Sequence, residues 1–332
     1  MKRTLLILSI LLATVFTANA QSSNAYLTLD GDTLVDESKL SGEELWKFAT
    51  LNRILDQGLQ REFWLYIPSK LKVHSFVIKN TPLVIALHGY DGKAYKYFPE
   101  LLEAARDYGF ALCIPVGIMD MEGKTGWNVG YPSQSGMRVD DGRFIMNLTR
   151  MLQDDMGFSK SSTFCTGMSN GGDMCYMLSR RYPSIFKAFA SMCGTLMTNI
   201  SDRYALSQPV NFMEIHGTDD QLARWAGDPD NKLGRGSYMS VPQAIDELKT
   251  VSGYIMTDIR ELEPYKKDSK LVIVHSYTGG KSGTEVVLYE IVNGVHGYFK
   301  DDLDAPGKIM SFFKSHCSQD ALEVMRTIFQ AR

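Results

Sequence analysis

The hydrophobic residues of this chain fall into short continuous runs that alternate with longer amphipathic segments. The runs predict strands covered on both faces, at residues 82–88, 110–115, 163–168, 188–192 and 210–215. Segments with apolar residues at helical spacing lie between or after them, at residues 98–108, 138–156, after 169 and at 241–252. This alternation predicts an α/β fold, in which a mainly parallel central sheet carries helices on both faces.

Further elements extend the pattern toward both ends of the chain. Residues 42–57 have apolar side chains on one helical face and predict a helix, and residues 60–68 alternate as a strand does. Residues 271–277 and 285–292 predict a late strand pair, and residues 306–317 predict a closing helix. Because no repeat or linker interrupts the pattern, we expect one main domain.

The first twenty residues predict a signal peptide. Lys2 and Arg3 are followed by an apolar stretch and by Ala18-Asn19-Ala20, a small-residue cleavage site. The apolar stretch is too short to span a bilayer, and no second segment is long and apolar enough. We therefore expect an exported protein, periplasmic or secreted, without stable membrane association. The expected division is a signal peptide over 1–20, an N-terminal extension over 21–59, the main domain over 60–317 and a C-terminal tail over 318–332.

Composition narrows the possible partners. The net charge is −3, and the Lys and Arg residues are scattered rather than gathered in a stripe, which argues against a nucleic-acid partner. Of the five cysteines, Cys113 and Cys165 lie in strand-like runs, where a buried free thiol is the ordinary role. The sequence has no C-x-x-C motif and no Cys/His cluster at metal spacing. We therefore expect neither a metal ion nor an organic cofactor.

One short stretch has the pattern of a nucleophile elbow. Gly167, Ser169 and Gly171 form a G-x-S-x-G motif between a predicted strand and a predicted helix. Glycines on either side of the serine let the strand and the helix pass close together, and the helix N-terminus favours developing negative charge. The motif predicts that Ser169 is a nucleophile, provided that a base and an acid follow it in the chain.

The base and the acid have candidates after later strands. His296 lies in a loop between Gly294 and Gly297, directly after the strand 285–292, and it is the preferred base. His275 lies within a strand and His316 at the end of a helix, so both are poorer candidates. The acid follows the strand at 210–215, where Asp219 and Asp220 compete and their spacing does not choose between them.

An oxyanion hole requires two backbone N–H donors. Asn170, the residue after the nucleophile, supplies one. Tyr90, in the loop that follows the strand at 82–88, is the candidate for the other, because Gly89 allows a close turn there.

These motifs together resemble a known family. They are L-H-G-Y-D-G at 87–92, W-N at 127–128, G-M-S-N-G-G-D-M at 167–174, H-G-T-D-D at 216–220 and N-G-V-H-G at 293–297. The set is similar to the polyhydroxybutyrate-depolymerase-like esterases, which include the feruloyl and acetylxylan esterases of carbohydrate esterase family 1. The resemblance covers residues 60 to 317 and implies the α/β-hydrolase fold. The resemblance also implies that Asp220 is the acid. The sequence departs from the family pattern at Gly297-Tyr298-Phe299, directly after the proposed base.

The motifs and the signal peptide predict an exported serine hydrolase that forms an acyl-enzyme, and the resemblance implies that it hydrolyses esters on plant polysaccharide. Three aromatic residues, Trp127, Trp225 and Tyr298, are candidates for stacking on a sugar or phenolic ring. The alternatives are hydrolysis of polyhydroxyalkanoate and a small secreted serine peptidase. A non-catalytic binding protein is a further alternative, but the chain lacks none of the three triad residues.

Overall fold

The computed structural model describes residues 26–27, 34–73, 76–94, 98–254, 256–280 and 283–330. The expected signal peptide lies outside the described residues, as does much of 21–33. Within the described part, no helix combines the length and apolar character needed to cross a bilayer. The helices are α1 (Gly42–Leu45), α2 (Pro99–Tyr108), α3 (Asp141–Asp155), α4 (Asn170–Arg181), α5 (Thr198–Arg203), α6 (Val241–Ser252), α7 (Ala305–Ser315) and α8 (Gln319–Gln330).

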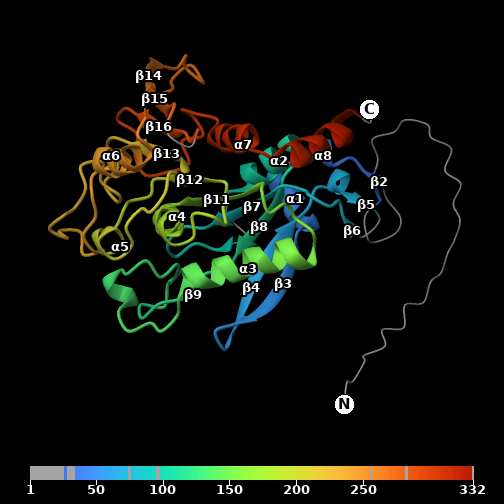
Figure 1. The fold of residues 1–332 in the computed structure, drawn as a ribbon, viewed down its shortest axis with the longest axis horizontal. Coiled ribbons are helices and arrows are strands. Elements are labelled where there is room, and N and C mark those ends of the chain that lie inside the picture. Colours follow the sequence, from blue (N-terminus) through green and yellow to red (C-terminus); the bar gives the residue numbers. More distant parts are fainter. Residues whose placement is uncertain are drawn as a thin grey trace, which may run out of the picture.

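A ten-stranded sheet forms the centre of the molecule (Figure 1). Its strands are β3 (Thr50–Asp56), β4 (Leu59–Tyr66), β7 (Leu83–Leu87), β8 (Ala111–Pro115), β11 (Thr163–Met168), β12 (Ala188–Met192), β13 (Asn211–Gly217), β14 (Met256–Glu261), β15 (Val272–Thr278) and β16 (Val286–Ile291). Short two-residue strands pair as β1 (Tyr26–Leu27) with β2 (Leu34–Val35), β5 (Lys72–Val73) with β6 (Phe76–Val77), and β9 (Ile118–Met119) with β10 (Thr125–Gly126).

The order of the strands places the predicted motifs on one edge. It runs β14-β15-β16-β13-β12-β11-β7-β8-β4-β3, and the strands from β16 to β8 are parallel. The outer pairs at each end are antiparallel. In a parallel sheet the carboxyl ends of the strands share one edge, so the loops after β7, β11, β13 and β16 leave the sheet on the same side.

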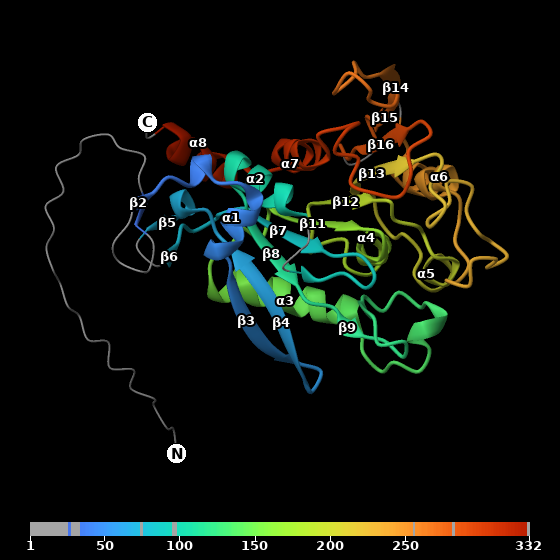
Figure 2. The same cartoon turned by 180° about the vertical axis from the view of Figure 1, so that it is seen from behind.

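Two helical layers cover the sheet, as Figures 1 and 2 show from opposite sides. The helices α1, α2, α7 and α8 pack on one face, in a core that contains Leu45, Leu102 and Phe313. The helices α3, α4 and α6 pack on the other face, in a core that contains Phe144, Leu178 and Leu248. Because each central strand is covered on both faces, all residues of β7, β8, β11, β12 and β13 are buried, as their continuous apolar runs predict.

The largest error of the sequence prediction is at the N-terminal side. The helix expected over 42–57 ends after one turn of α1 and a short 3₁₀ segment at Trp46–Phe48, and residues 50–56 form the strand β3. Leu51 and Leu55 are exposed on β3 rather than packed on a helix face. Pairing of β3 with β4 along its whole length outweighs the helical spacing of the leucines. One strand of the main sheet thus comes from the expected N-terminal extension.

Candidate active site

Ser169 lies at a sharp turn between β11 and α4. Its backbone has φ 55° and ψ −122°, a strained conformation for a residue with a Cβ atom. The flanking glycines permit this turn: a Cβ atom at Gly167 would lie 2.3 Å from the carbonyl oxygen of Gly171, and one at Gly171 would lie 2.2 Å from that of Leu87. The strand, the helix and β7 therefore meet around a half-buried serine, as the elbow motif predicts.

His296 and Asp220 lie together after two neighbouring parallel strands, β16 and β13. The distance from His296 Nδ1 to Asp220 Oδ2 is 2.6 Å, and the second oxygen of Asp220 accepts hydrogen bonds from the backbone N–H groups of Leu222 and Ala223, each at 2.8 Å. The Asp220 side chain is fully buried, whereas that of His296 is 15% exposed. The carboxylate is thus held in one orientation, and the imidazole can be reached from solvent.

Electrostatics favour an ionised Asp220. Burial alone would raise the pKa of this carboxyl, but the hydrogen bond and charge of His296 and the N–H of Ala223 outweigh burial and leave its pKa below the ordinary value. An ionised Asp220 accepts a hydrogen bond from the Nδ1–H of His296, which leaves the lone pair of Nε2 available. Asp219, the competing candidate, is exposed and accepts a hydrogen bond from Gln221 instead.

A second buried pair lies directly behind Asp220 on β13. His216 Nδ1 is 3.0 Å from Glu214 Oε1, and its Nε2 donates to the carbonyl oxygen of Ala223 at 2.7 Å. The same Nε2 is 3.7 Å from Asp220 Oδ2. Burial would lower the pKa of His216, but the bond to Glu214 and its charge raise it instead. No sequence motif singles out Glu214, although a glutamate inside a buried apolar strand is itself a signal of a specific role.

The two predicted oxyanion donors flank the serine. Asn170 is the first residue of α4, and its side chain clamps the backbone of Trp127: its Oδ1 accepts from the N–H at 2.7 Å, and its Nδ2 donates to the carbonyl at 3.1 Å. Tyr90 follows Gly89, where an added Cβ atom would lie 3.5 Å from the Cβ of Ser169. The Tyr90 hydroxyl donates to Asp120, which anchors the loop. The loop that contains Tyr90 and the loop that contains Trp127 are therefore both held in place near Ser169.

The structure does not support a substrate contact for Trp127. This side chain is fully buried, and its Nε1 donates to the carbonyl oxygen of His88 at 2.8 Å, so the ring has no face free for a ligand. Trp225 and Tyr298 are half-buried. Trp225 lies edge-on to His216, with 6.1 Å between the ring centroids, and Tyr298 stacks on Phe98 at 4.4 Å. These two rings retain exposed surface.

Ser169 and His296 share no hydrogen bond among the described residues. Serine–histidine bonds are often long in ligand-free enzymes and tighten when substrate binds, so the geometry does not argue against their cooperation. The backbone N–H of Ser169 donates to the carbonyl oxygen of Met192 at 2.8 Å. Cys193 follows Met192 at the end of β12. Its Sγ lies within 4.8 Å of a ring nitrogen of His296 and of a carboxylate oxygen of Asp220. No sequence motif points to a role for Cys193.

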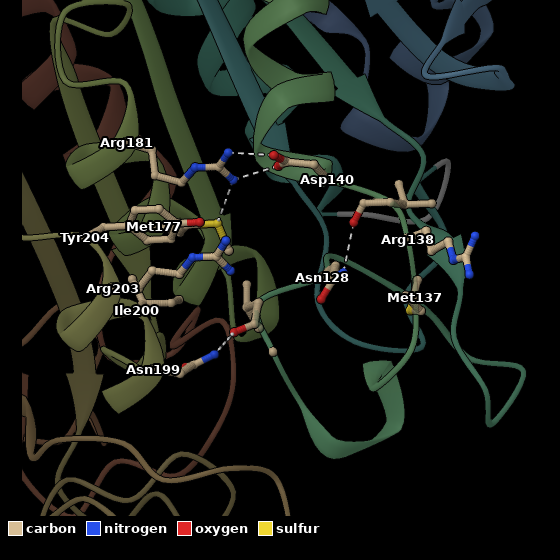
Figure 3. Close-up of a pocket in the computed structure, with 13 residues that line it drawn as sticks. Asn128, Met137, Arg138, Asp140, Met177, Arg181, Asn199, Ile200, Arg203 and Tyr204 are labelled. Carbon is tan, nitrogen blue, oxygen red and sulfur yellow. Dashed lines mark hydrogen bonds and ion pairs between the residues drawn. The ribbon is translucent and has the colours of Figure 1, made fainter.

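A separate pocket of about 310 Å³ lies between the loop before α3, the second half of α4 and α5 (Figure 3). Arg181 points across it to Asp140, with 2.6 Å between Nη2 and Oδ2, and Arg203, Tyr204 and Asn199 line the same wall. None of the predicted site residues lines this pocket. It is therefore distinct from the edge that carries Ser169, Asp220 and His296.

The curated relatives that the chain matches are feruloyl esterases. No protein-family model matches the sequence. The chain is 27% identical over 182 residues to feruloyl esterase C of Emericella nidulans, a match that covers 53% of this chain and 61% of the relative. It is 26% identical over 160 residues to the probable feruloyl esterase C of Aspergillus niger, covering 48% and 55%. The chain thus spans less than two thirds of the length of the curated relatives it matches.

Solved structures support the fold. The acetyl xylan esterase from Aspergillus awamori aligns with a TM-score of 0.52 at 14% identity, over 80% of this chain and 99% of that one. The S-formylglutathione hydrolase from Agrobacterium tumefaciens has the same TM-score and identity over 81% and 94%. A dipeptidyl aminopeptidase IV homologue from Bacteroides ovatus also aligns with a TM-score of 0.52, at 12% identity over 80% and 35%. The chain therefore has the α/β-hydrolase fold, and its sequence is similar to that of feruloyl esterases.

Proposed function

We propose that this chain is an exported serine esterase that hydrolyses carboxylic esters on plant polysaccharide, of the feruloyl or acetylxylan type. The observation that carries the proposal is the 2.6 Å contact between His296 and Asp220, on the sheet edge where Ser169 occupies a strained elbow. Similarity to feruloyl esterase C supports the choice of substrate class.

The mechanism has two steps. Ser169 Oγ attacks the ester carbonyl carbon while Nε2 of His296 accepts the hydroxyl proton and then donates it to the departing alcohol. The backbone N–H groups of Asn170 and Tyr90 stabilise the oxyanion that forms. Water then hydrolyses the acyl-enzyme by the same proton route. Asp220 keeps the Nδ1 hydrogen of His296 in place throughout, so that Nε2 stays the basic nitrogen.

A labelling experiment tests the nucleophile. A fluorophosphonate probe should label the wild type and the control Ser161→Ala, whose serine is exposed and lies before β11. It should not label Ser169→Ala, whose ester turnover should fall by several orders of magnitude. Labelling that persists in Ser169→Ala would contradict the assignment of Ser169 as the nucleophile.

A substrate panel tests the class. Methyl ferulate, acetylated xylan, a peptide amide and polyhydroxybutyrate granules are offered side by side to the wild type. Aryl or sugar esters should be cleaved fastest, because an amide leaving group requires protonation as it departs and raises the barrier. Equal cleavage of the peptide would favour a serine peptidase, and rapid clearing of granules would favour a polyhydroxyalkanoate depolymerase.

A further inference from the structure

Cys193 adds a thiol to the residues proposed for catalysis. It follows β12 in a left-handed conformation with φ 52°, and its N–H donates to the carbonyl oxygen of Ile215 at 2.9 Å. This turn directs the side chain toward the loops after β13 and β16, where Sγ lies 3.5 Å from the carbonyl oxygen of Gly297. The Cys193 side chain is fully buried. A strained residue is thus fixed with its sulfur beside the imidazole–carboxylate pair.

The ligand atoms have the spacing of a cation site. Cys193 Sγ, a carboxylate oxygen of Asp220 and a ring nitrogen of His296 all lie within 4.8 Å of one another. In a tetrahedral zinc site the ligand atoms are about 3.3–3.6 Å apart, given Zn–S bonds of about 2.3 Å and Zn–N bonds of about 2.0 Å. Nδ1 of His296 and Oδ2 of Asp220 are 2.6 Å apart in their hydrogen bond, so coordination through this nitrogen requires the pair to open. The three residues come from three different loops, so no spacing in the sequence could indicate them.

We propose that Cys193, Asp220 and His296 form an inhibitory binding site for a thiophilic divalent cation of the Zn²⁺ class. Sulfur, imidazole nitrogen and carboxylate oxygen together suit Zn²⁺ and disfavour Mg²⁺ and Ca²⁺, which prefer oxygen ligands. Three protein ligands leave a fourth position for water. The exposed edge of the His296 ring provides the entrance.

Binding of the cation blocks catalysis whichever ring nitrogen is used. Coordination through Nε2 removes the lone pair that accepts the serine proton. Coordination through Nδ1 breaks the hydrogen bond to Asp220 and places the ring hydrogen on Nε2, which is the wrong tautomer. This inhibition rests on the proposed serine esterase function, whereas binding of the cation does not. The two claims can therefore fail separately.

The experiment has an activity arm and a binding arm. Metal-free full-length protein is titrated with ZnCl₂ during hydrolysis of an aryl acetate, with MgCl₂ as the control cation and EDTA to test reversal. Each variant is compared with its own metal-free rate. Micromolar Zn²⁺ should inhibit the wild type and the control Cys317→Ser. Cys193→Ser should require at least about tenfold more Zn²⁺, since even outer-shell partners of metal ligands contribute that much.

Calorimetric titration of Ser169→Ala with ZnCl₂ measures binding without turnover. One site should appear, and the double variant Ser169→Ala/Cys193→Ala should lose it while its circular dichroism spectrum stays unchanged. Equal inhibition of Cys193→Ser and wild type, or no binding to Ser169→Ala, would overturn the proposal. An inactive wild type that still binds Zn²⁺ through Cys193 would instead refute the esterase function and leave the cation site standing.

Discussion

At the scale of single residues, the two neighbouring aspartates after β13 have different surroundings. Asp220 is buried, accepts two backbone hydrogen bonds and contacts His296, whereas Asp219 is exposed and contacts Gln221. The sequence alone left this choice open, and family resemblance favoured Asp220. The fold places Asp220, and not Asp219, against His296, which supports our proposal that Asp220 is the acid.

Substitution of each aspartate in turn tests this difference. Asp220→Asn should lower turnover of an aryl ester by about 10³–10⁴-fold, because the amide favours the wrong tautomer of His296. Asp219→Asn is the matched control and should stay near the wild-type rate. Steady-state kinetics on both variants, with thermal melts to confirm folding, provides the measurement. The reverse order of effects would assign the acid to Asp219.

The sequence predicted site residues that lie in local motifs, but not those whose surroundings depend on contacts distant in the sequence. Ser169 and His296 could be named because each follows an apolar strand at a turn rich in glycine, whereas the acid could be narrowed only to Asp219 or Asp220. The burial of Trp127 could not be foreseen, because it depends on Asn170, which is 43 residues away and clamps the Trp127 backbone. The pairing of Glu214 with His216 could have been suspected, since both point from one face of a buried strand.

At the scale of elements, the first turn of α4 carries an unusual carboxyl group. Asp173 is buried and accepts hydrogen bonds from the Tyr131 hydroxyl and from the N–H and hydroxyl of Thr195, the last two at 2.6 Å and 3.0 Å. Burial raises its pKa to about 6, although these bonds and the charge of His296 oppose the rise. Asp173, in the first turn of α4, therefore loses its proton at a higher pH in the folded state than in the unfolded state.

This raised pKa makes a signed prediction for stability. Between about pH 4 and pH 6 the unfolded state loses the Asp173 proton first, so the free energy of unfolding falls as pH rises, by up to about 3 kcal/mol for this group. Asp173→Asn should remove that contribution and make the pH dependence flatter across this window. Urea unfolding of both proteins at pH 4, 5, 6 and 7 measures it. Parallel curves for the two proteins would show that Asp173 titrates normally.

Most elements with a clear apolar pattern, whether a continuous run, alternation or helical spacing, were predicted well, whereas β3 and β14 were not. The strands β7, β8, β11, β12 and β13 and the helices α2, α3, α6 and α7 lie within a few residues of the expected ranges. The strand β14 was missed because all six of its residues are exposed, so it has no hydrophobic pattern to detect. The strand β3 was misread for a similar reason, since its exposed leucines imitate a helix face.

At the scale of the whole molecule, the segment after residue 317 belongs to the core. We expected a tail over 318–332, outside the family resemblance. The structure forms α8 there; Ala321 is fully buried, and Met325 is buried in the same core as α2 and α7. Ser318 at its start exchanges hydrogen bonds with Ser162, just before β11. The C-terminal helix thus contributes to the layer that supports the elbow strand.

Truncation of one buried side chain tests this contribution. Met325→Ala should lower the free energy of unfolding by about 2–5 kcal/mol, because Met325 is 2% exposed and its loss leaves a cavity. Arg326→Ala, on the exposed face of the same helix, should change it by less than about 0.5 kcal/mol. Chemical denaturation of both variants gives the comparison. Equal, small effects would mean that α8 packs loosely.

The outer position of β14 has a consequence for how copies of this protein behave in concentrated solution. Its backbone pairs with β15 on one side, and on the other side it presents an open strand edge with Met256 and Ile259 exposed. Asp258, Arg260 and Glu261 interrupt this edge with charges of both signs. Such charges discourage edge-to-edge stacking of identical sheets. Neutralising those three side chains should therefore make association of copies through this strand edge easier.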